Sequence, residues 1–227
     1  AYNNSIGKSY LNLSAGINAQ ETQSGNLSSH YRGFPSAALH TIGHAKEIVE
    51  KPSGEDNKTR LMGIFFSGNY SWNNIFLADA SIRFDGSSEF GAESQWGSFW
   101  SLGAGWNVHH EKFLEGNAWI KQFKLRASMG YTGTQNVDPS QSRARYEYYD
   151  YVYGDKIGAQ LVALPNDKLK WQRNMDYNLG VDVTLKRFLT LRADYYIQRT
   201  DDLLSNISLP PSTGFLTYTE NLGKIEN

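Results

Sequence analysis

The sequence predicts an all-β fold, an antiparallel transmembrane β-barrel segment with about eight strands of a larger barrel, long extracellular loops and short periplasmic turns. Apolar and polar residues alternate along most of the 227 residues, and the alternating runs reach nine to twelve residues. A tilted strand that crosses a bilayer needs about nine to eleven residues, whereas an average strand of a globular protein has five or six. Short and long connections also alternate between the runs, as they do in outer-membrane barrels.

Each strand is predicted from a run in which every second residue is apolar or small. In the first run Leu11, Leu13 and Ile17 alternate with polar residues such as Asn12 and Asn18. Helical periodicity is nearly absent. The runs cover residues 11–19, 62–72, 76–84, 96–106, 123–131, 175–185 and 189–197, and a weaker eighth run follows Leu216.

The faces opposite the apolar residues carry charged and small side chains, as a water-filled barrel interior requires. A soluble β-sandwich would show the same alternation with its polar face outward, so the alternation alone leaves both architectures open. In a barrel, the charged residues that we expect to face the lumen are Asp79, Arg83, Lys124, Arg126, Arg192 and Asp194.

The connections favour the barrel. Asn73-Asn74 and Lys186-Arg187-Phe188 are short turns, and the long connections are residues 21–59, 86–95, 133–168 and 201–215. Short turns on one side and long loops on the other are typical of outer-membrane barrels, whose long loops are extracellular. Aromatic residues gather near the ends of the runs, where their rings suit the headgroup layer of a membrane.

Composition excludes several classes of protein. With 22 basic and 23 acidic side chains the net charge is -1, so there is no drive toward nucleic acid. The absence of cysteine excludes disulfides and thiolate metal sites. No apolar run approaches the 18 residues of a transmembrane helix.

No residue pattern indicates a metal, a cofactor or a catalytic centre. His40 and His44 are four residues apart but have no third ligand at a recognisable spacing. His109 and His110 are adjacent and would point to opposite sides of a strand. Asp85, Ser87 and Glu89 alternate oxygens but lack the rest of a calcium loop, so a structural turn is the better interpretation. No nucleophile elbow, phosphate loop or dinucleotide fingerprint occurs, and we expect no enzyme activity.

One loop has an unusual composition. The segment from Arg143 to Tyr153 reads RARYEYYDYVY. Tyrosine rings with nearby charges suit contact with a sugar or a partner protein, but a loop hairpin whose tyrosines pack on each other explains them equally well. The candidate contact residues in the loops are Tyr146, Tyr148, Tyr149, Tyr151, Tyr153 and Trp171.

Seven blocks with recognisable sequences occur between residues 60 and 227. They are ASIRFDGSSEFG at 80–91 with WGSF at 96–99 and GAGW at 103–106, LRASMGYTGTQN at 125–136, LPNDKLKW at 164–171, NLGVD at 178–182, ADYY at 193–196 with DDLL at 201–204, LPPSTGF at 209–215, and NLGKIEN at 221–227. Their order is that found in SusC/RagA-type TonB-dependent outer-membrane transporters, and the sequence resembles part of the barrel of that family. Two departures are Trp100 after Phe99, where the family usually has proline, and Gln172 after Trp171, where glutamate is commoner.

The resemblance implies a protein of the outer membrane of a Gram-negative, Bacteroidetes-like bacterium, in contact with membrane lipid. It implies uptake of glycan or peptide fragments, energised by TonB through parts of the protein absent from this sequence. A SusD-like lipoprotein would cover the extracellular loops. Residues 1–227 would then be part of the barrel domain, since neither a plug domain nor a TonB box is present. The alternatives are a soluble, secreted β-sandwich that binds carbohydrate and an eight-stranded outer-membrane enzyme.

Overall fold

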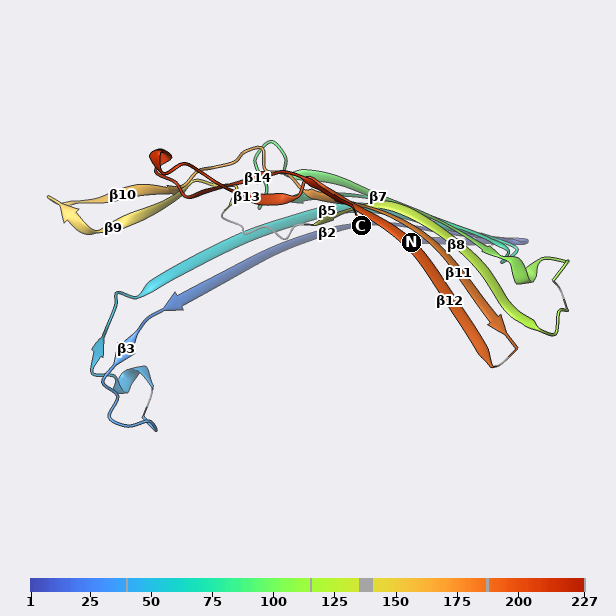
Figure 1. Cartoon of the computed structure of the whole chain (residues 1–227), viewed down its shortest axis with the longest axis horizontal. Coiled ribbons are helices and arrows are strands. Elements are labelled where there is room, and N and C mark those ends of the chain that lie inside the picture. The colour runs from blue at the N-terminus through green and yellow to red at the C-terminus, as the bar shows by residue number, and fades with distance from the viewer. Residues whose placement is uncertain (40, 115, 135–140, 187, 227) are drawn as a thin grey trace. The chain divides into compact units, whose positions relative to one another are not determined.

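The computed structural model describes residues 1–227 except 40, 115, 135–140, 187 and 227, and describes only the backbone of residues 150–153. Its main element is a sheet of nine antiparallel strands in the order β1-β2-β5-β6-β7-β8-β11-β12-β15. Figure 1 labels β2, β5, β7, β8, β11 and β12 of this sheet. The all-β prediction is therefore confirmed. Among the described residues, no helix has the length and apolar character needed to cross a membrane.

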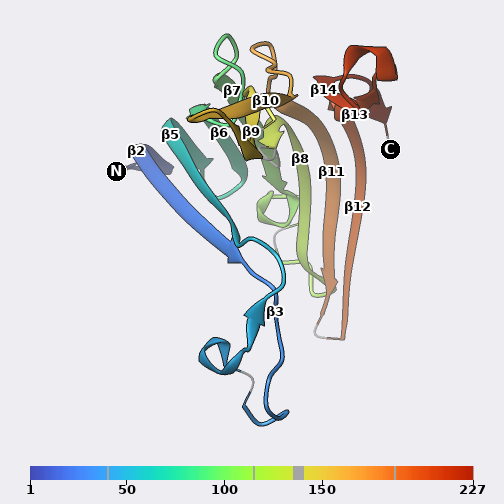
Figure 2. The ribbon, with the colours of Figure 1, turned by 90° about the vertical axis from the view of Figure 1, so that its left-hand side faces the viewer.

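Neighbouring strands of this sheet follow one another along the chain, apart from the segments inserted at the long connections (Figure 2). Seven of the predicted runs lie in these strands, and the sheet gains β1 and β15, which the alternation did not predict. The bounds are β1 Tyr2–Ile6, β2 Ser9–Ser28, β5 Ser53–Trp72, β6 Phe76–Ser87, β7 Trp96–Asn107, β8 Ile120–Thr134, β11 Gln172–Leu185, β12 Leu189–Asp201 and β15 Lys224–Glu226.

The short turns adopt backbone conformations that their residues tolerate. Asn73 and Asn74 have φ angles of 51° and 55° between β5 and β6, and asparagine enters this left-handed region more readily than most residues. The amide N–H of Asn73 donates to the carbonyl of Lys8, 2.6 Å away, in the turn between β1 and β2. The two turns therefore lie at the same end of the sheet, as the predicted short-turn side requires.

The predicted loop 21–59 is instead largely a hairpin, and this corrects the sequence interpretation. Residues Glu21–Arg60 form a compact unit separate from the rest of the chain. Within it, the last residues of β2 and the first of β5 continue as strands, and β3 (Tyr31–Arg32) pairs with β4 (Glu47–Ile48). A single 3-10 turn, η1, covers Ile42–His44.

Two further hairpins interrupt the predicted long connections. β9 (Arg145–Tyr153) pairs with β10 (Lys156–Ala163), and β13 (Leu204–Ser208) pairs with β14 (Thr217–Asn221). The weak eighth run is thus only the short strand β14, outside the main sheet. Two 3-10 turns, η2 (Val108–His110) and η3 (Pro211–Thr213), complete the elements.

The large apolar side chains of the main sheet are not packed in a sandwich core. Phe66, Phe84 and Val181 are 52%, 42% and 36% exposed. The buried hydrophobic cluster consists instead of Phe90, Phe99, Leu169 and Trp171. The described residues therefore do not support the sandwich alternative.

Candidate functional site

The strand register divides the main sheet into an apolar and a polar face. Residues paired across an antiparallel sheet point to the same side. On one side Ala104 pairs with Ala127, which pairs with Leu179. On the other side Asp79 pairs with Gly103, which pairs with Ser128. The same register places all six residues expected to face the lumen on this second, polar face.

An ion network connects three strands of the polar face. Arg126 of β8 contacts Asp182 of β11 through Nε, at 3.0 Å, and Asp194 of β12 through Nη2, at 2.9 Å. Arg192 lies 3.8 Å from Asp182. On β6, Arg83 donates to Asp85 at 2.5 Å and to Asn18 of β2 at 2.9 Å. Most of the charged residues that the sequence assigned to this face are therefore paired with opposite charges on the same face of the sheet.

Glycines on the polar face let these charged side chains lie flat across neighbouring strands. A Cβ at Gly180 would approach Oδ1 of Asp194 to 2.5 Å and Cζ of Arg126 to 2.8 Å. A Cβ at Gly103 would approach both carboxylate oxygens of Asp79 to within 2.6 Å. Gly180 thus leaves room for the ion network, because a Cβ at this position would force the side chains of Asp194 and Arg126 to shift.

Aromatic rings line the short-turn end of the apolar face. Trp72 stacks on Phe76 with ring centres 5.8 Å apart, and Phe76 stacks on Trp106 at 6.0 Å. Nearby, Nζ of Lys186 lies 3.4 Å from the ring centre of Trp119. Stacked aromatic rings with an adjacent ammonium group are suited to the interface between a membrane and water.

At the long-loop end, the LPNDKLKW segment packs beneath the loop that follows β6. Leu169 is fully buried, and Trp171 is 5% exposed. The Trp171 ring lies 4.4 Å from that of Phe90 and 5.3 Å from that of Phe99, and its Nε1 donates to the carbonyl of Gln95. The indole of Trp171, a candidate contact residue from the sequence, is therefore enclosed by these partners.

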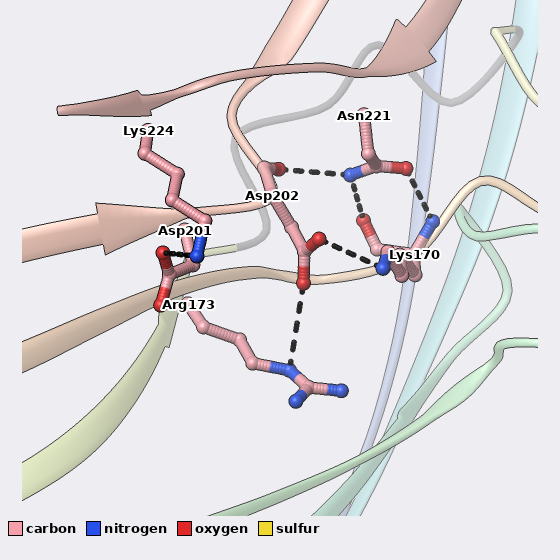
Figure 3. A network of polar contacts seen from close by, with 6 residues as sticks. All are labelled: Lys170, Arg173, Asp201, Asp202, Asn221 and Lys224. Carbon is pink, nitrogen blue, oxygen red and sulfur yellow. Dashed lines mark hydrogen bonds and ion pairs between the residues drawn. The ribbon is translucent and has the colours of Figure 1, made fainter.

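At the same end of the sheet, the side chain of Asn221 joins Lys170, which precedes β11, to Asp202, which follows β12 (Figure 3). Its Oδ1 accepts from the backbone N–H of Lys170 at 2.9 Å, and its Nδ2 donates to the Lys170 carbonyl at 2.8 Å. Nδ2 also donates to the carbonyl of Asp202 at 2.9 Å. A primary amide has the donor and acceptor of a peptide group, so Asn221 acts as an added rung of sheet pairing. We call this arrangement the Asn221 clamp.

Ion pairs surround the Asn221 clamp (Figure 3). Asp202, with a φ of 59°, pairs with Lys170 at 2.7 Å and lies 3.9 Å from Arg173. Asp201 pairs with Lys224 of β15 at 3.2 Å. The clamp therefore connects the end of β14 to the residues just before β11 and just after β12. The sequence did not predict this network, because Asn221 bonds to backbone groups, which every residue type has.

The tyrosine-rich segment is a hairpin, with its tyrosines on both faces of β9. Tyr149 lies over Gly158, and its hydroxyl donates to Gln160 at 3.0 Å. Tyr146 and Tyr148 are 61% and 71% exposed on the other face. The segment is thus a hairpin, as the alternative interpretation expected, but the described tyrosines Tyr146, Tyr148 and Tyr149 are all exposed and the contacts of Tyr149 are with β10. The side chains of Tyr151 and Tyr153 lie outside the described part.

The histidine candidates have ordinary local partners. His109 and His110 lie in the turn η2, not on a strand, and their rings are 4.1 Å apart. Their Nδ1 atoms contact the backbone carbonyls of Phe123 and Asn74. His40 lies outside the described residues. Within the described part, no group of three or more His, Cys, Asp or Glu residues could hold a metal ion.

Ser87 and Asp85, singled out for their alternating oxygens, are buried at the end of β6. The Oγ of Ser87 accepts from the N–H of Glu89 at 3.3 Å, and Asp85 pairs with Arg83. These contacts agree with the interpretation of the segment as a structural turn.

Comparison with known proteins agrees with the two-faced sheet. Residues 1–227 match the family described as TonB dependent receptor-like, beta-barrel. The chain is 34% identical over 196 residues to TonB-dependent receptor P39 of Formosa agariphila, with 86% of this chain and 19% of the relative covered. It is 34% identical over 192 residues to TonB-dependent receptor SusC of Bacteroides thetaiotaomicron, with 81% of this chain and 19% of the relative covered.

Solved structures show the same fold. The RagAB peptide transporter superposes with a TM-score of 0.87 at 24% identity, over 99% of this chain and 25% of that chain. The siderophore receptor PirA of Pseudomonas aeruginosa superposes with a TM-score of 0.54 at 11% identity, over 99% of this chain and 43% of that chain. The chain spans about a fifth of the length of the curated relatives described above.

Proposed function

The chain belongs to the TonB-dependent receptor-like β-barrel family, and we propose that the protein containing it actively imports glycan or peptide fragments across the outer membrane of a Gram-negative bacterium. Its relatives are transporters named as TonB-dependent receptors, and none of those described above is named as an enzyme. Energy for uptake would come through TonB, which acts on parts of the protein outside residues 1–227.

The observation that carries the proposal is the two-faced sheet. Its apolar side chains are exposed on one face, while the opposite face holds ion pairs and glycines. This combination suits a wall with lipid on one side and water on the other. In the proposed transporter, the polar face lines the lumen and the ends with long hairpins point outward from the cell.

We place substrate or partner contact at the long-loop end. Tyr146 and Tyr148 project from the same face of β9 and are largely exposed. Their rings offer apolar faces with hydroxyl groups at the rim, which suit a sugar, a peptide or a covering protein. A SusD-like lipoprotein is the covering partner that we propose. SusC and the RagAB peptide transporter are the relatives that motivate this choice.

Energised uptake tests the proposed function. A strain lacking the whole gene should lose accumulation of a labelled substrate pool of oligosaccharides and peptides, and the intact gene should restore it. Deleting tonB should abolish the restored uptake, whereas a passive channel would continue to equilibrate small solutes. Uptake that persists at the same rate without TonB would contradict active import.

A variant series connects the uptake to the exposed tyrosines. Tyr146→Ala together with Tyr148→Ala should reduce uptake while leaving the protein in the outer membrane. Tyr149→Phe removes only the hydroxyl bonded to Gln160 and serves as the matched control. Equal uptake by the double variant and the control would exclude the two tyrosines from substrate contact.

A further inference from the structure

A groove of about 650 Å³ lies on the apolar face of the main sheet and crosses β6, β7, β8, β11 and β12. Two adjacent rows of paired residues supply its side chains, and the alanines among them leave space between the larger residues. The row nearer the short turns is Phe76, Trp106, Leu125, Val181 and Ala193, and the next row is Ala104, Ala127, Leu179 and Tyr195. A groove on this face suits a hydrocarbon chain, because its walls are apolar and it faces away from the polar side of the sheet.

The apolar surface continues from the groove to the short turns. The pairs that follow on this face of β8 and β11 are Phe123 with Val183 and then Ile120 with Leu185. Leu179 and Leu185 are six residues apart, which at about 3.4 Å per residue and a strand tilt of about 45° corresponds to about 14 Å of membrane depth. One leaflet contributes about 15 Å of hydrocarbon. The groove and the strip beyond it therefore fit within a single leaflet, the one nearer the short turns.

Two lysines lie where this strip reaches the short turns. Nζ of Lys186 lies 3.4 Å from the ring centre of Trp119, and the Lys186 backbone N–H donates to the Trp119 carbonyl. Lys121 follows Ile120 at a shift in the strand register, one residue from the Ile120–Leu185 pair. Within the part of the chain that the structure describes, neither ammonium group has a carboxylate partner. Both are therefore open to an anion at the edge of the apolar strip.

The nearby carboxylate of Glu111 has another partner. Its Oε1 accepts from the indole Nε1 of Trp106, 3.2 Å away. Trp106 also stacks on Phe76 at the side of the groove. The contact thus fixes the position of an aromatic wall and engages the acid that could otherwise pair with the lysines.

We infer that this surface binds one phospholipid whose headgroup has a net negative charge, in the leaflet at the short-turn end. The lysines attract the anionic headgroup, and the groove holds an acyl chain that reaches it over the apolar strip. A zwitterionic phospholipid carries the same phosphate but adds a positive charge of its own, so the lysines favour it less. The inference concerns a lipid partner and goes beyond the proposed import function, on which it does not depend.

Lipid binding to the full-length protein in detergent tests the headgroup preference. The probes are phosphatidylglycerol and phosphatidylcholine with the same acyl chains, and native mass spectrometry measures the fraction of protein with bound lipid. The wild type should bind phosphatidylglycerol at least about fivefold more tightly. Lys121→Gln together with Lys186→Gln should remove most of this preference and leave phosphatidylcholine binding unchanged. Lys156→Gln together with Lys168→Gln makes the same change of charge at the long-loop end and should preserve the preference.

A second pair of variants tests the groove. Ala127→Phe fills it and should weaken the binding of both lipids by about threefold or more. Ala15→Phe adds the same ring to the apolar face of β2 and should leave binding unchanged.

Three results would overturn the inference. The first is equal binding of the two lipids by the wild type, and the second is an equal effect of either test variant and its control. The third is displacement of bound phosphatidylglycerol by excess inorganic phosphate, which would show that the lysines hold an anion without the groove.

Discussion

At the scale of single residues, two asparagines of the β13–β14 hairpin use their amides differently. Asn221 donates twice through Nδ2, to the carbonyls of Lys170 and Asp202. Asn206 uses its Oδ1 to accept from the hydroxyl of Thr219. A carboxylate can replace an acceptor but not a donor, so the two positions should differ in their tolerance of aspartate.

Asn221→Asp should loosen the hairpin. The change removes both Nδ2 donors and places a negative oxygen against two carbonyls, which costs about 1–3 kcal/mol of local opening free energy. Hydrogen exchange followed by mass spectrometry should show faster exchange in residues 203–222. Asn206→Asp keeps the acceptor and should leave exchange unchanged. Equal exchange in the two variants would refute the role of the Asn221 clamp.

The carboxyl group of Glu21 should make the stability of the hairpin unit, residues 21–60, depend on pH. Hydrogen bonds from Lys58 and then Arg60 lower the pKa of the Glu21 carboxyl below its usual value. A carboxyl with a lowered pKa stabilises the folded state above the unfolded pKa, and this stabilisation is lost as pH falls through the folded pKa.

The hairpin of residues 21–60 should therefore open more readily below about pH 4.5, the ordinary range of a glutamate. The measurement is hydrogen exchange of this segment at several pH values, corrected for the intrinsic pH dependence of exchange. Glu21→Gln cannot ionise, so its hairpin should lack this pH dependence. Identical pH profiles of the wild type and Glu21→Gln would show that the carboxylate does not stabilise the hairpin.

At the scale of elements, β11 presents neighbouring residues to two different environments. Leu179 lies on the apolar face and is 59% exposed, whereas Asn178 lies on the polar face beside Ser128. The alternation of the sequence predicted this strand because each of its faces meets a different medium. The fold class and the spanning strands were predictable for that reason.

Leu179→Lys should destabilise the inserted barrel far more than Asn178→Lys. A lysine on the lipid face near the middle of a strand costs about 2–4 kcal/mol, whereas on the water-filled side it is tolerated. Urea unfolding of the full-length protein in micelles or bilayers measures the difference. A similar loss of stability in both variants would contradict the assignment of the two faces.

The strand segments that the sequence did not predict lie where the two faces of a strand no longer differ in polarity. Beyond Ala19, β2 continues to Ser28 through mainly polar residues, and no period-2 signal remains once both faces meet water. The candidate site was predictable only in part. The Arg126 network follows from residue type and register, but the enclosure of Trp171 depends on a contact with Phe90 that is distant in sequence.

At the scale of the whole molecule, the main sheet is open in this chain, and its relatives are four to five times longer. Residues 1–227 therefore supply one wall, and their ion pairs and glycines line one side of it. The proposed transport function depends on which side of that wall meets lipid. The polar face must meet water for the proposed lumen to exist.

Spin labels on alternate residues measure the two sides of the wall most directly. Residues 1–227 contain no cysteine, so single cysteines can be labelled within them once any elsewhere in the full-length protein have been removed. In reconstituted bilayers, labels at Ala127, Met129 and Leu179 should collide frequently with oxygen and rarely with a water-soluble nickel complex. Labels at Lys124, Ser128 and Asn178 should show the opposite. Equal exposure of both sets to the nickel complex, or the reverse pattern, would contradict the assignment of the polar face to the lumen.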